Sequence, residues 1–197
     1  MATQALRKIN GRLKFLYRNQ NYLTYSLRRL LCNALIQPHF DFACLAWYPN
    51  LNQKFKGKIQ SAQNKCIRFC LMLGNRAHIG VNEFQRINWL PTKKRFEQCV
   101  CVNIFIFFAK TAPAYISEMY HLVEQSRNTQ RSSNQLQFPN QATNRGLKTL
   151  SCIGTRLWNA LPILIFSLNN VNNFKHKLKE NFFKDIQKEE YSLYIRY

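Results

Sequence analysis

Apolar side chains recur at helical spacing through the first part of the chain. In residues 2–17 they return every three or four positions, which places them on one face of an α-helix. The next segment matches the same template with Leu27, Leu30, Leu31, Ala34 and Leu35. Thr24 stands before it as an N-cap, and Pro38 suits the first turn of a further helix that extends to Trp47. We therefore predict helices over all three segments.

The longest amphipathic segment runs from about Asn52 to Leu73. Gly74 follows it, at the position where a left-handed residue often ends a helix. Further helices are predicted over residues 82–87 and 92–109, and residues 173–187 carry large apolar side chains at four-residue steps. The predicted fold class is mainly α.

A polar stretch interrupts this helical pattern from about Gln125 to Arg145. It is rich in Gln, Asn, Ser and Thr, and Leu136 and Phe138 are its only large apolar residues, so little of it is expected to be buried. We predict three parts: a helical, bundle-like body over residues 1–124, a long polar linker over 125–146, and a small, mostly helical C-terminal piece over 147–197.

Charge changes the picture, because 29 Lys and Arg stand against 9 Asp and Glu, for a net charge of +20. Residues 1–82 contain one acid, Asp41. An excess of this kind repels itself in a compact chain unless a polyanion offsets it, so nucleic acid is the first candidate partner and an anionic membrane surface the second. Basic residues share one flank of the first helix, and others share a sector of roughly 80° on the long helix. The candidate nucleic-acid-binding residues are Arg7, Lys14, Arg18, Arg28, Arg29, Lys54, Lys58, Lys65 and Arg68.

Exposed aromatic residues could add base stacking to such a surface. The aromatic residues considered are Tyr17, Tyr22, Trp47, Tyr48 and Trp89. A tryptophan beside a turn is more often a core or loop anchor, and we expect that role for Trp47 and Trp89. Trp158 is likewise expected to be a packing anchor of the C-terminal piece.

The pattern also bears on compartment. The longest apolar run, residues 99–109, is about half the length of a bilayer span, and residues 1–20 show no secretory signal. Seven cysteines are scattered among apolar neighbours, an odd number that does not suit a secreted disulfide framework. We expect an intracellular protein, nuclear or cytoplasmic, with no transmembrane segment.

Few residues carry the chemistry of an enzyme. A two-metal nucleotidyl-transfer site needs acidic side chains that hold two cations about 4 Å apart, and the only aspartates are Asp41 and Asp185. The glycines form no phosphate-binding loop of either common type. His39 and Cys44 beside Asp41 could form a nucleophile set, but their aromatic neighbours favour a packed core. We predict that the chain alone is not an enzyme and needs no cofactor.

Cysteine pairs raise the alternative of a zinc site. Cys66 and Cys70 lie four apart on a helix, Cys99 and Cys101 lie two apart, and His78 offers a nitrogen ligand. No Cys-x2-Cys pair or zinc-knuckle spacing is present, and both pairs lie in apolar runs. We therefore expect buried structural cysteines.

Several motifs, taken in order, resemble one family. They are RLKFLYR and IQPHFDFA within residues 12–52, NWLP within 58–96, APAY at 112–115, GTRLWNALP within 147–162, and NNFKHKLKENFF at 172–183. This series resembles the region after the palm in jockey-like non-LTR (LINE-type) retrotransposon reverse transcriptases. The resemblance covers nearly the whole chain, from about residue 7 to residue 184.

The resemblance implies a parent RNA-directed DNA polymerase that uses Mg²⁺ and has an endonuclease upstream. Endonuclease, fingers and palm are missing here, as is the Tyr/Phe-Ala-Asp-Asp motif; Phe40-Asp41-Phe42-Ala43 is not that motif. No catalytic residue of the family is therefore carried over. In the parent, this region would form a helical thumb that grips the template–primer duplex.

The expected function is sequence-nonspecific binding of RNA or DNA backbone, without polymerisation. The alternative is a non-functional, partner-binding or self-associating remnant of a truncated mobile element, whose apolar faces have lost their palm. A membrane-surface role ranks last, because the 99–109 run has no charged face.

Overall fold

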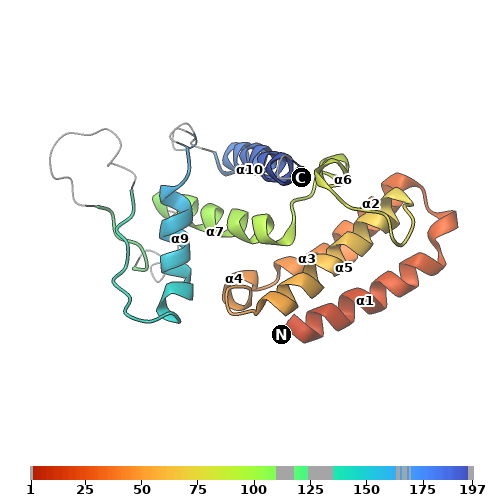
Figure 1. The fold of residues 1–197 in the computed structure, drawn as a ribbon, viewed down its shortest axis with the longest axis horizontal. Coiled ribbons are helices and arrows are strands. Elements are labelled where there is room, and N and C mark those ends of the chain that lie inside the picture. The colour runs from red at the N-terminus through yellow and green to blue at the C-terminus, as the bar shows by residue number, and fades with distance from the viewer. Residues whose placement is uncertain are drawn as a thin grey trace. The chain divides into compact units, whose positions relative to one another are not determined.

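The structure is a computed structural model that describes residues 2–109, 118–123, 135–162, 165, 168 and 170–194. The described part of the chain is mainly helical, which confirms the predicted fold class (Figure 1). It divides into two compact units. Unit 1 comprises Met1–Phe96 with Phe182–Tyr197, and unit 2 comprises Glu97–Asn181.

The boundaries of these two units differ from those of the three predicted parts. The predicted body ended at residue 124, whereas unit 1 ends its first stretch at Phe96 and regains the chain at Phe182. The physical reason lies in unit 2, where aromatic residues from three separate helices stack together, as described below. Sequence composition marks polar stretches, but it does not show which apolar faces pack together.

Unit 1 is built mainly from amphipathic helices. Its elements are α1 (Ala2–Arg18), the 3-10 turn η1 (Gln20–Tyr22), α2 (Tyr25–Leu35), α3 (Gln37–Asp41), α4 (Cys44–Trp47), α5 (Gln53–Leu71), α6 (Val81–Ile87), the first turn of α7 (Thr92–Phe108) and the second half of α10 (Val171–Tyr194).

Local chemistry explains where these helices begin. The Thr24 side chain accepts a hydrogen bond from the Leu27 amide, and the Asn52 side chain accepts one from the Phe55 amide at 2.9 Å. Each cap satisfies a backbone donor that has no partner inside the helix. Pro38 lies in the first turn of α3, where its missing amide is not needed.

The predicted glycine end of the long helix is wrong. Met72, not Gly74, adopts the left-handed conformation after α5, with a φ of 54°. The Met72 amide donates to the carbonyls of Arg68 and Phe69, and the Leu73 amide donates to Arg68 at 2.9 Å. Hydrogen bonds to the last carbonyls of the helix therefore hold a conformation that methionine alone does not favour.

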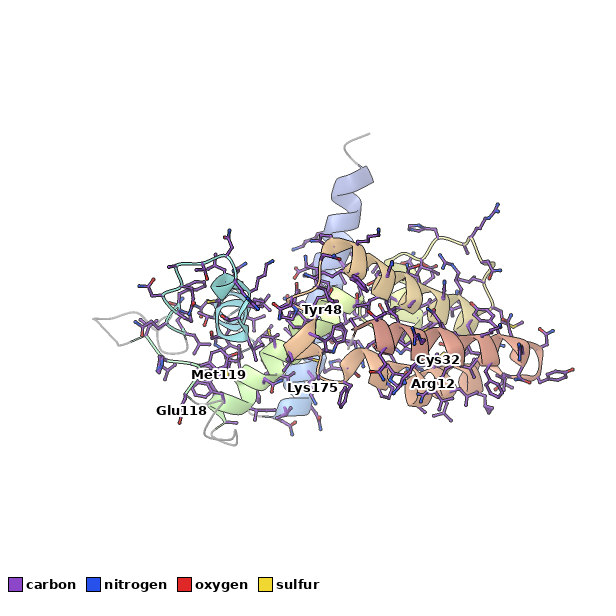
Figure 2. The ribbon with its side chains drawn as sticks, turned by 90° about the horizontal axis from the view of Figure 1, so that it is seen from below. Arg12, Cys32, Tyr48, Glu118, Met119 and Lys175 are labelled. Atoms are coloured by element: carbon purple, nitrogen blue, oxygen red, sulfur yellow. The ribbon has the colours of Figure 1, made fainter. Side chains whose placement is uncertain are left out.

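The core of unit 1 lies where α1, α2 and α5 pack together. The side chains of Ile9, Leu16, Ile67 and Phe69 are at most 1% exposed. Each contributes roughly 1.5–3 kcal/mol by leaving water. Arg12 projects from α1 and donates to the carbonyl of Leu35 at the end of α2 (Figure 2).

One part of the α2 prediction is wrong. Leu27 is 46% exposed and Leu30 is 63% exposed, although both belong to the predicted apolar face. The buried residues of α2 are Arg28 and Cys32 instead. α2 is thus oriented with the basic side chain of Arg28 inside unit 1. The hydrogen bonds that Arg28 makes there are described with the candidate interface.

Unit 2 is organised around stacked aromatic rings. Phe105 of α7 stacks on Phe174 of α10 with ring centroids 4.3 Å apart, and Phe108 stacks on Trp158 of α9 (Leu150–Asn159) at 4.9 Å. Trp158 is 2% exposed, so it is the packing anchor expected from its motif. A 3-10 turn, η2 (Gly146–Lys148), precedes α9.

Leu136 is the one buried residue in the described part of the polar stretch, most of which is exposed as expected. It is 1% exposed and pairs with Leu122 in an isolated antiparallel bridge. The Asn159 side chain accepts from the Leu136 amide at 3.0 Å and donates to the Leu136 carbonyl at 2.9 Å. Phe138 is 48% exposed, and residues 125–134 of the predicted linker lie outside the described residues.

Gly154 gives a test of this packing. A Cβ built there would lie 2.6 Å from the Tyr120 hydroxyl oxygen and 3.0 Å from Cδ1 of Ile104. We therefore expect Gly154→Ala to lower the free energy of unfolding by about 1–3 kcal/mol, because the neighbours must move to admit a methyl group. Denaturant unfolding followed by circular dichroism measures it.

Gly57 is the matched control for this substitution. It lies inside α5, and a Cβ there would meet no atom within 4 Å. Gly57→Ala should raise the free energy of unfolding by about 0.5–1 kcal/mol through helix propensity alone. A stabilising effect of both substitutions would show that α9 does not pack against Tyr120 in this way.

Candidate nucleic-acid interface

Helices α1 and α5 of unit 1 are joined near their C-terminal ends. The Tyr17 hydroxyl donates to the Lys65 carbonyl at 2.9 Å, and the Tyr17 ring meets Phe69 edge-on with centroids 5.2 Å apart. The two helices run side by side in the same direction (Figure 1). A flank of one helix and a flank of the other can therefore form one continuous face.

The structure brings the two predicted basic flanks together in a hollow. Lys14 and Arg18 approach it from α1, and Lys65 and Arg68 approach it from α5. Asn75, from the loop after α5, completes the polar lining, and the volume is about 600 Å³. That volume lies within the usual range of ligand sites in proteins. We call it the basic hollow.

Arg68 and Tyr17 of the basic hollow each donate a hydrogen bond to a backbone carbonyl of unit 1. The Arg68 Nε donates to the Ala77 carbonyl at 2.9 Å, which directs the guanidinium from the end of α5 toward the following loop. Burial, and then the nearby Cys66, raise the pKa of Tyr17 to about 12. Tyr17 therefore remains a neutral hydrogen-bond donor at physiological pH.

The charge of the hollow is unbalanced. Its lining contains four cationic side chains and no carboxylate. Asp41, the only acid among the first 82 residues, is occupied elsewhere: its two oxygens each lie 2.5 Å from a nitrogen of Arg95. Four like charges held together repel one another, and a bound anion would relieve that repulsion.

Three further predicted residues are exposed on the same helices. Arg7 lies within about 20° of Lys14 around α1, and Lys54 and Lys58 fall in the same sector of α5 as Lys65. They do not line the hollow but precede it along the two helices. The Lys58 ammonium lies 5.2 Å from the centre of the Phe55 ring.

Arg28 lies inside unit 1 and is removed from the candidate interface. It is 6% exposed; its Nε donates to the Cys70 carbonyl at 3.1 Å and its Nη1 donates to the Leu23 carbonyl at 2.7 Å. Cys70 lies in the last turn of α5, where carbonyls lack partners within the helix. Arg28 thus ties the end of α5 to the start of α2.

Arg29 contributes little to the basic face as well. Its side chain is half-buried, and its Nε is enclosed with no hydrogen-bond partner among the described residues. Seven of the nine predicted binding residues therefore remain on the faces of α1 and α5.

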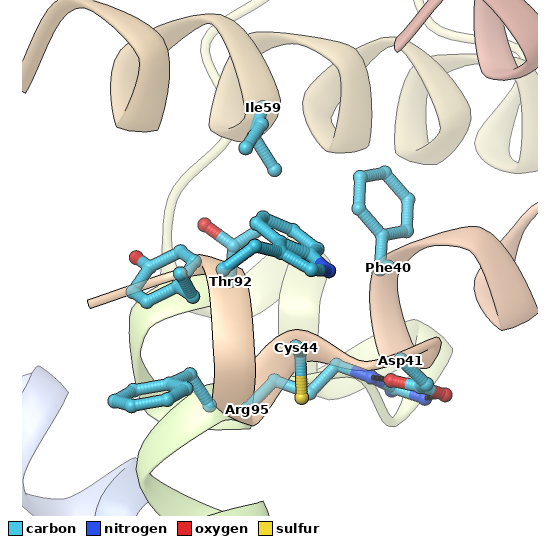
Figure 3. Close-up of a pocket in the computed structure, with 9 residues that line it drawn as sticks. Phe40, Asp41, Cys44, Ile59, Thr92 and Arg95 are labelled. Atoms are coloured by element: carbon cyan, nitrogen blue, oxygen red, sulfur yellow. Dashed lines mark hydrogen bonds and ion pairs between the residues drawn. The ribbon is translucent and has the colours of Figure 1, made fainter. Parts of the chain in front are cut away.

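Two residues of the nucleophile set considered above, Asp41 and Cys44, lie in one corner of unit 1. Asp41 forms an ion pair with Arg95 beside a small cavity of about 10 Å³, which Phe40, Cys44 and Ile59 also line (Figure 3). A space of that size has room for about one water molecule. This corner is a packed core closed by an ion pair, which agrees with the structural interpretation of these residues.

The cysteines are free, and six of the seven are buried. Hydrogen bonding and burial raise the pKa values of Cys32 and Cys70, so both are thiols at neutral pH. Among the described residues, no three His, Cys, Asp or Glu side chains gather in a way that could hold a metal ion.

The aromatic residues considered for base stacking differ in their exposure. Tyr48 and Trp89 are buried, and the Trp89 indole donates to Asn33 at 3.0 Å. The Trp47 indole donates to the Phe42 carbonyl at 2.8 Å, while Tyr22, just after α1, is 88% exposed. Tyr22 alone among them presents an open ring.

Sequence reasoning missed two features of the hollow. Asn75 and the Ala77 carbonyl come from the loop after α5, and no periodic pattern marks either of them. The only available signal was that a polar loop follows a helix whose last turn carries Arg68.

Two further findings concern membrane-spanning helices and similarity to known proteins. Within the described ranges, no helix has both the length and the apolar character that a bilayer span requires. In comparisons with models of protein families, with curated proteins and with solved structures, no significant match to this chain was found.

Proposed function

We propose that this chain binds the backbone of RNA or DNA, without reading sequence, through the faces of α1 and α5. The observation that carries the proposal is the basic hollow, where cations from two helices converge with no carboxylate among them. Lys and Arg only donate hydrogen bonds, and phosphate oxygens only accept them, so donors and acceptors match.

The same geometry favours backbone contacts over base contacts. Tyr17 is the one aromatic residue in the lining, and its hydroxyl and its ring are both engaged inside the unit. Phosphate contacts of this kind give affinity and orientation but no sequence information.

The simplest competing explanation is that these residues complement the helix dipoles. Arg18 and Arg68 lie in the last turns of α1 and α5, where a positive charge is favourable. That explanation accounts for each helix separately. It does not account for Lys14 and Lys65, which add further positive charge to the same hollow and increase the repulsion there.

The resemblance in sequence supports a specific origin. We infer that the chain corresponds to the region after the palm of a non-LTR retrotransposon reverse transcriptase, where a helical thumb would grip the duplex. We expect no polymerisation by this region alone, because its sequence lacks the Tyr/Phe-Ala-Asp-Asp motif of the parent family. Mg²⁺ would belong to the catalytic region of the parent enzyme.

The test is a salt titration of binding. Labelled RNA–DNA hybrid and two unrelated DNA duplexes are titrated by fluorescence anisotropy between about 50 and 200 mM salt. The seven cations on the faces of α1 and α5 predict a log–log slope of about −6 at full engagement, with similar affinities for all sequences. A flat slope, or strong preference for one sequence, would contradict the proposal.

One observation favours a second candidate, self-association. Leu27 and Leu30 lie three positions apart on α2 and are 46% and 63% exposed. Apolar side chains on one helix face can join two copies of a chain. Light scattering at high salt distinguishes the candidates, because a monomer supports nucleic-acid binding as the main role and a salt-insensitive oligomer supports association.

A further inference from the structure

The basic hollow differs from the rest of the basic face in being concave. Arg7, Lys54 and Lys58 are separate cations along two helices, whereas the four cations of the hollow converge on one space of about 600 Å³. Convergent charge suits a compact group with more than one negative charge. Evenly spaced charge suits a strand that passes by.

We propose that the basic hollow binds a terminal phosphate group, a phosphomonoester at the end of a nucleic-acid strand. The inference rests on the proposed function and names the ligand of one part of that surface. A phosphomonoester carries a charge of about −1.5 to −2 at neutral pH and three terminal oxygens. A phosphate within a strand carries one charge, so it matches fewer of the cations present.

Arg68 supplies the fixed part of the site. The Ala77 carbonyl is the one hydrogen-bond partner of its guanidinium among the described residues, and it takes only the Nε. The two terminal amino groups remain for a ligand, in the fork arrangement that matches two phosphate oxygens. Because the Nε is already held, less side-chain freedom is lost when a phosphate binds.

The remaining donors come from the other side of the hollow. Lys14 and Arg18 project from α1, Lys65 projects beside Arg68, and the Asn75 amide adds a neutral donor. Lys65 is held at its backbone by Tyr17, and its side chain is exposed. Three phosphate oxygens can therefore meet donors from α1, α5 and the following loop together.

The strand end is favoured over free phosphate by what lies next to the hollow. Arg7, Lys54 and Lys58 share the helix sectors of its four cations and lie toward the N-terminal ends of α1 and α5. A strand whose end enters the hollow could place its next phosphates along those residues. Free oligophosphate has the same chemistry but gains nothing from them.

The experiment compares two strands of identical sequence. One ends in a 5′-phosphate and the other in a 5′-hydroxyl; both carry the label at the far end, and binding is followed by anisotropy. We expect the phosphorylated strand to bind about tenfold more tightly, because a second charge meets an oriented guanidinium. A strand with a 3′-phosphate, labelled at its 5′ end, shows whether either end is accepted. Equal affinities for all three strands would overturn the role of the strand end.

Two variants locate the effect. Arg68→Gln and Lys65→Gln should each reduce the tenfold difference to about twofold or less. Lys65→Gln keeps the backbone contact with Tyr17 and so retains the fold even if Arg68→Gln does not. The control is Lys58→Gln, outside the hollow, which should weaken both strands equally and preserve their ratio. A ratio that survives in Lys65→Gln and falls in Lys58→Gln would contradict the site.

Calorimetry with inorganic tripolyphosphate separates this inference from the proposed function. If the protein binds no nucleic acid, the proposed function fails, and tripolyphosphate binding that Lys65→Gln abolishes would still support an oligophosphate site. If tripolyphosphate binds but a terminal phosphate changes nothing, the ligand is free oligophosphate and the strand-end proposal is wrong. If nucleic acid binds while neither phosphate probe shows an effect, the hollow contacts only passing backbone.

Discussion

Reversing the charge of Lys14, Arg18 and Lys65 to glutamate should weaken duplex binding by at least about 100-fold. Three lost phosphate contacts of about 1 kcal/mol each account for roughly that factor, and the new negative charges add repulsion. The log–log salt slope should become shallower by about 3, since each phosphate contact contributes about −0.9. All three side chains are exposed, so helical content should not change.

A matched variant controls for total charge. Lys93, Lys148 and Lys175 are also exposed, and none of them lines the basic hollow. Changing these three to glutamate alters the net charge by the same amount. We expect it to reduce affinity by less than about fivefold, through long-range electrostatics alone. Equal losses in the two triple variants would mean that overall charge, rather than the faces of α1 and α5, determines binding.

Replacing Arg28 by methionine should instead destabilise unit 1 by about 2–4 kcal/mol. Methionine approximates the volume of the side chain but cannot donate to the carbonyls of Leu23 and Cys70, which would then be buried without these partners. The expected fall in melting temperature is about 10 °C or more. Thermal unfolding followed by circular dichroism measures it.

Arg18→Met is the control for that substitution. It removes the same charge from an exposed position, so stability should change by less than about 0.5 kcal/mol while affinity falls. The two arginines should therefore separate cleanly, one affecting folding and the other binding. An Arg28→Met protein with unchanged stability would show that these two hydrogen bonds do not hold α2 to the end of α5.

The sequence predicts most helices because their ends and faces are set locally. Thr24 and Asn52 cap α2 and α5 through neighbours three residues away, and such chemistry is visible in the sequence. The left-handed Met72 was not predictable in this way, because no rule of composition selects methionine there. Asn159 clamps Leu136 across 23 positions of the chain, and a single sequence gives no sign of that pairing.

The helical spacing of the sequence contained a partial sign that Arg28 is buried. It lies four residues before Cys32 and seven before Leu35, at the spacing of one helix face, and Cys32 is fully buried. Because Arg28 lies in a basic stretch, the sequence alone led us to assign it to the charged surface instead of the core. The carbonyls that it satisfies belong to α5 and to the start of α2, so its role depended on tertiary packing.

The basic hollow could be predicted only in part. Helix geometry placed Lys14 with Arg18 and Lys65 with Arg68, because each pair occupies a single helix. The meeting of the two pairs depends on the packing of α1 against α5, to which the Tyr17 contact belongs. Charge excess thus indicated the class of partner, while packing determined where that charge gathers.

Lysine footprinting tests the central claim most directly. The protein is treated with an acetylating reagent with and without saturating RNA–DNA hybrid, and the acetylation rate of each lysine is measured by mass spectrometry. The account predicts that the candidate binding lysines of α1 and α5 are acetylated at least about fivefold more slowly with the hybrid than without it, because phosphate contacts withdraw their amines from the reagent. The lysines expected to be protected are Lys14, Lys54, Lys58 and Lys65, and the reference lysines expected to be unchanged are Lys93, Lys148 and Lys175. Uniform protection of both sets, or protection of the reference set alone, would contradict a binding face on these two helices.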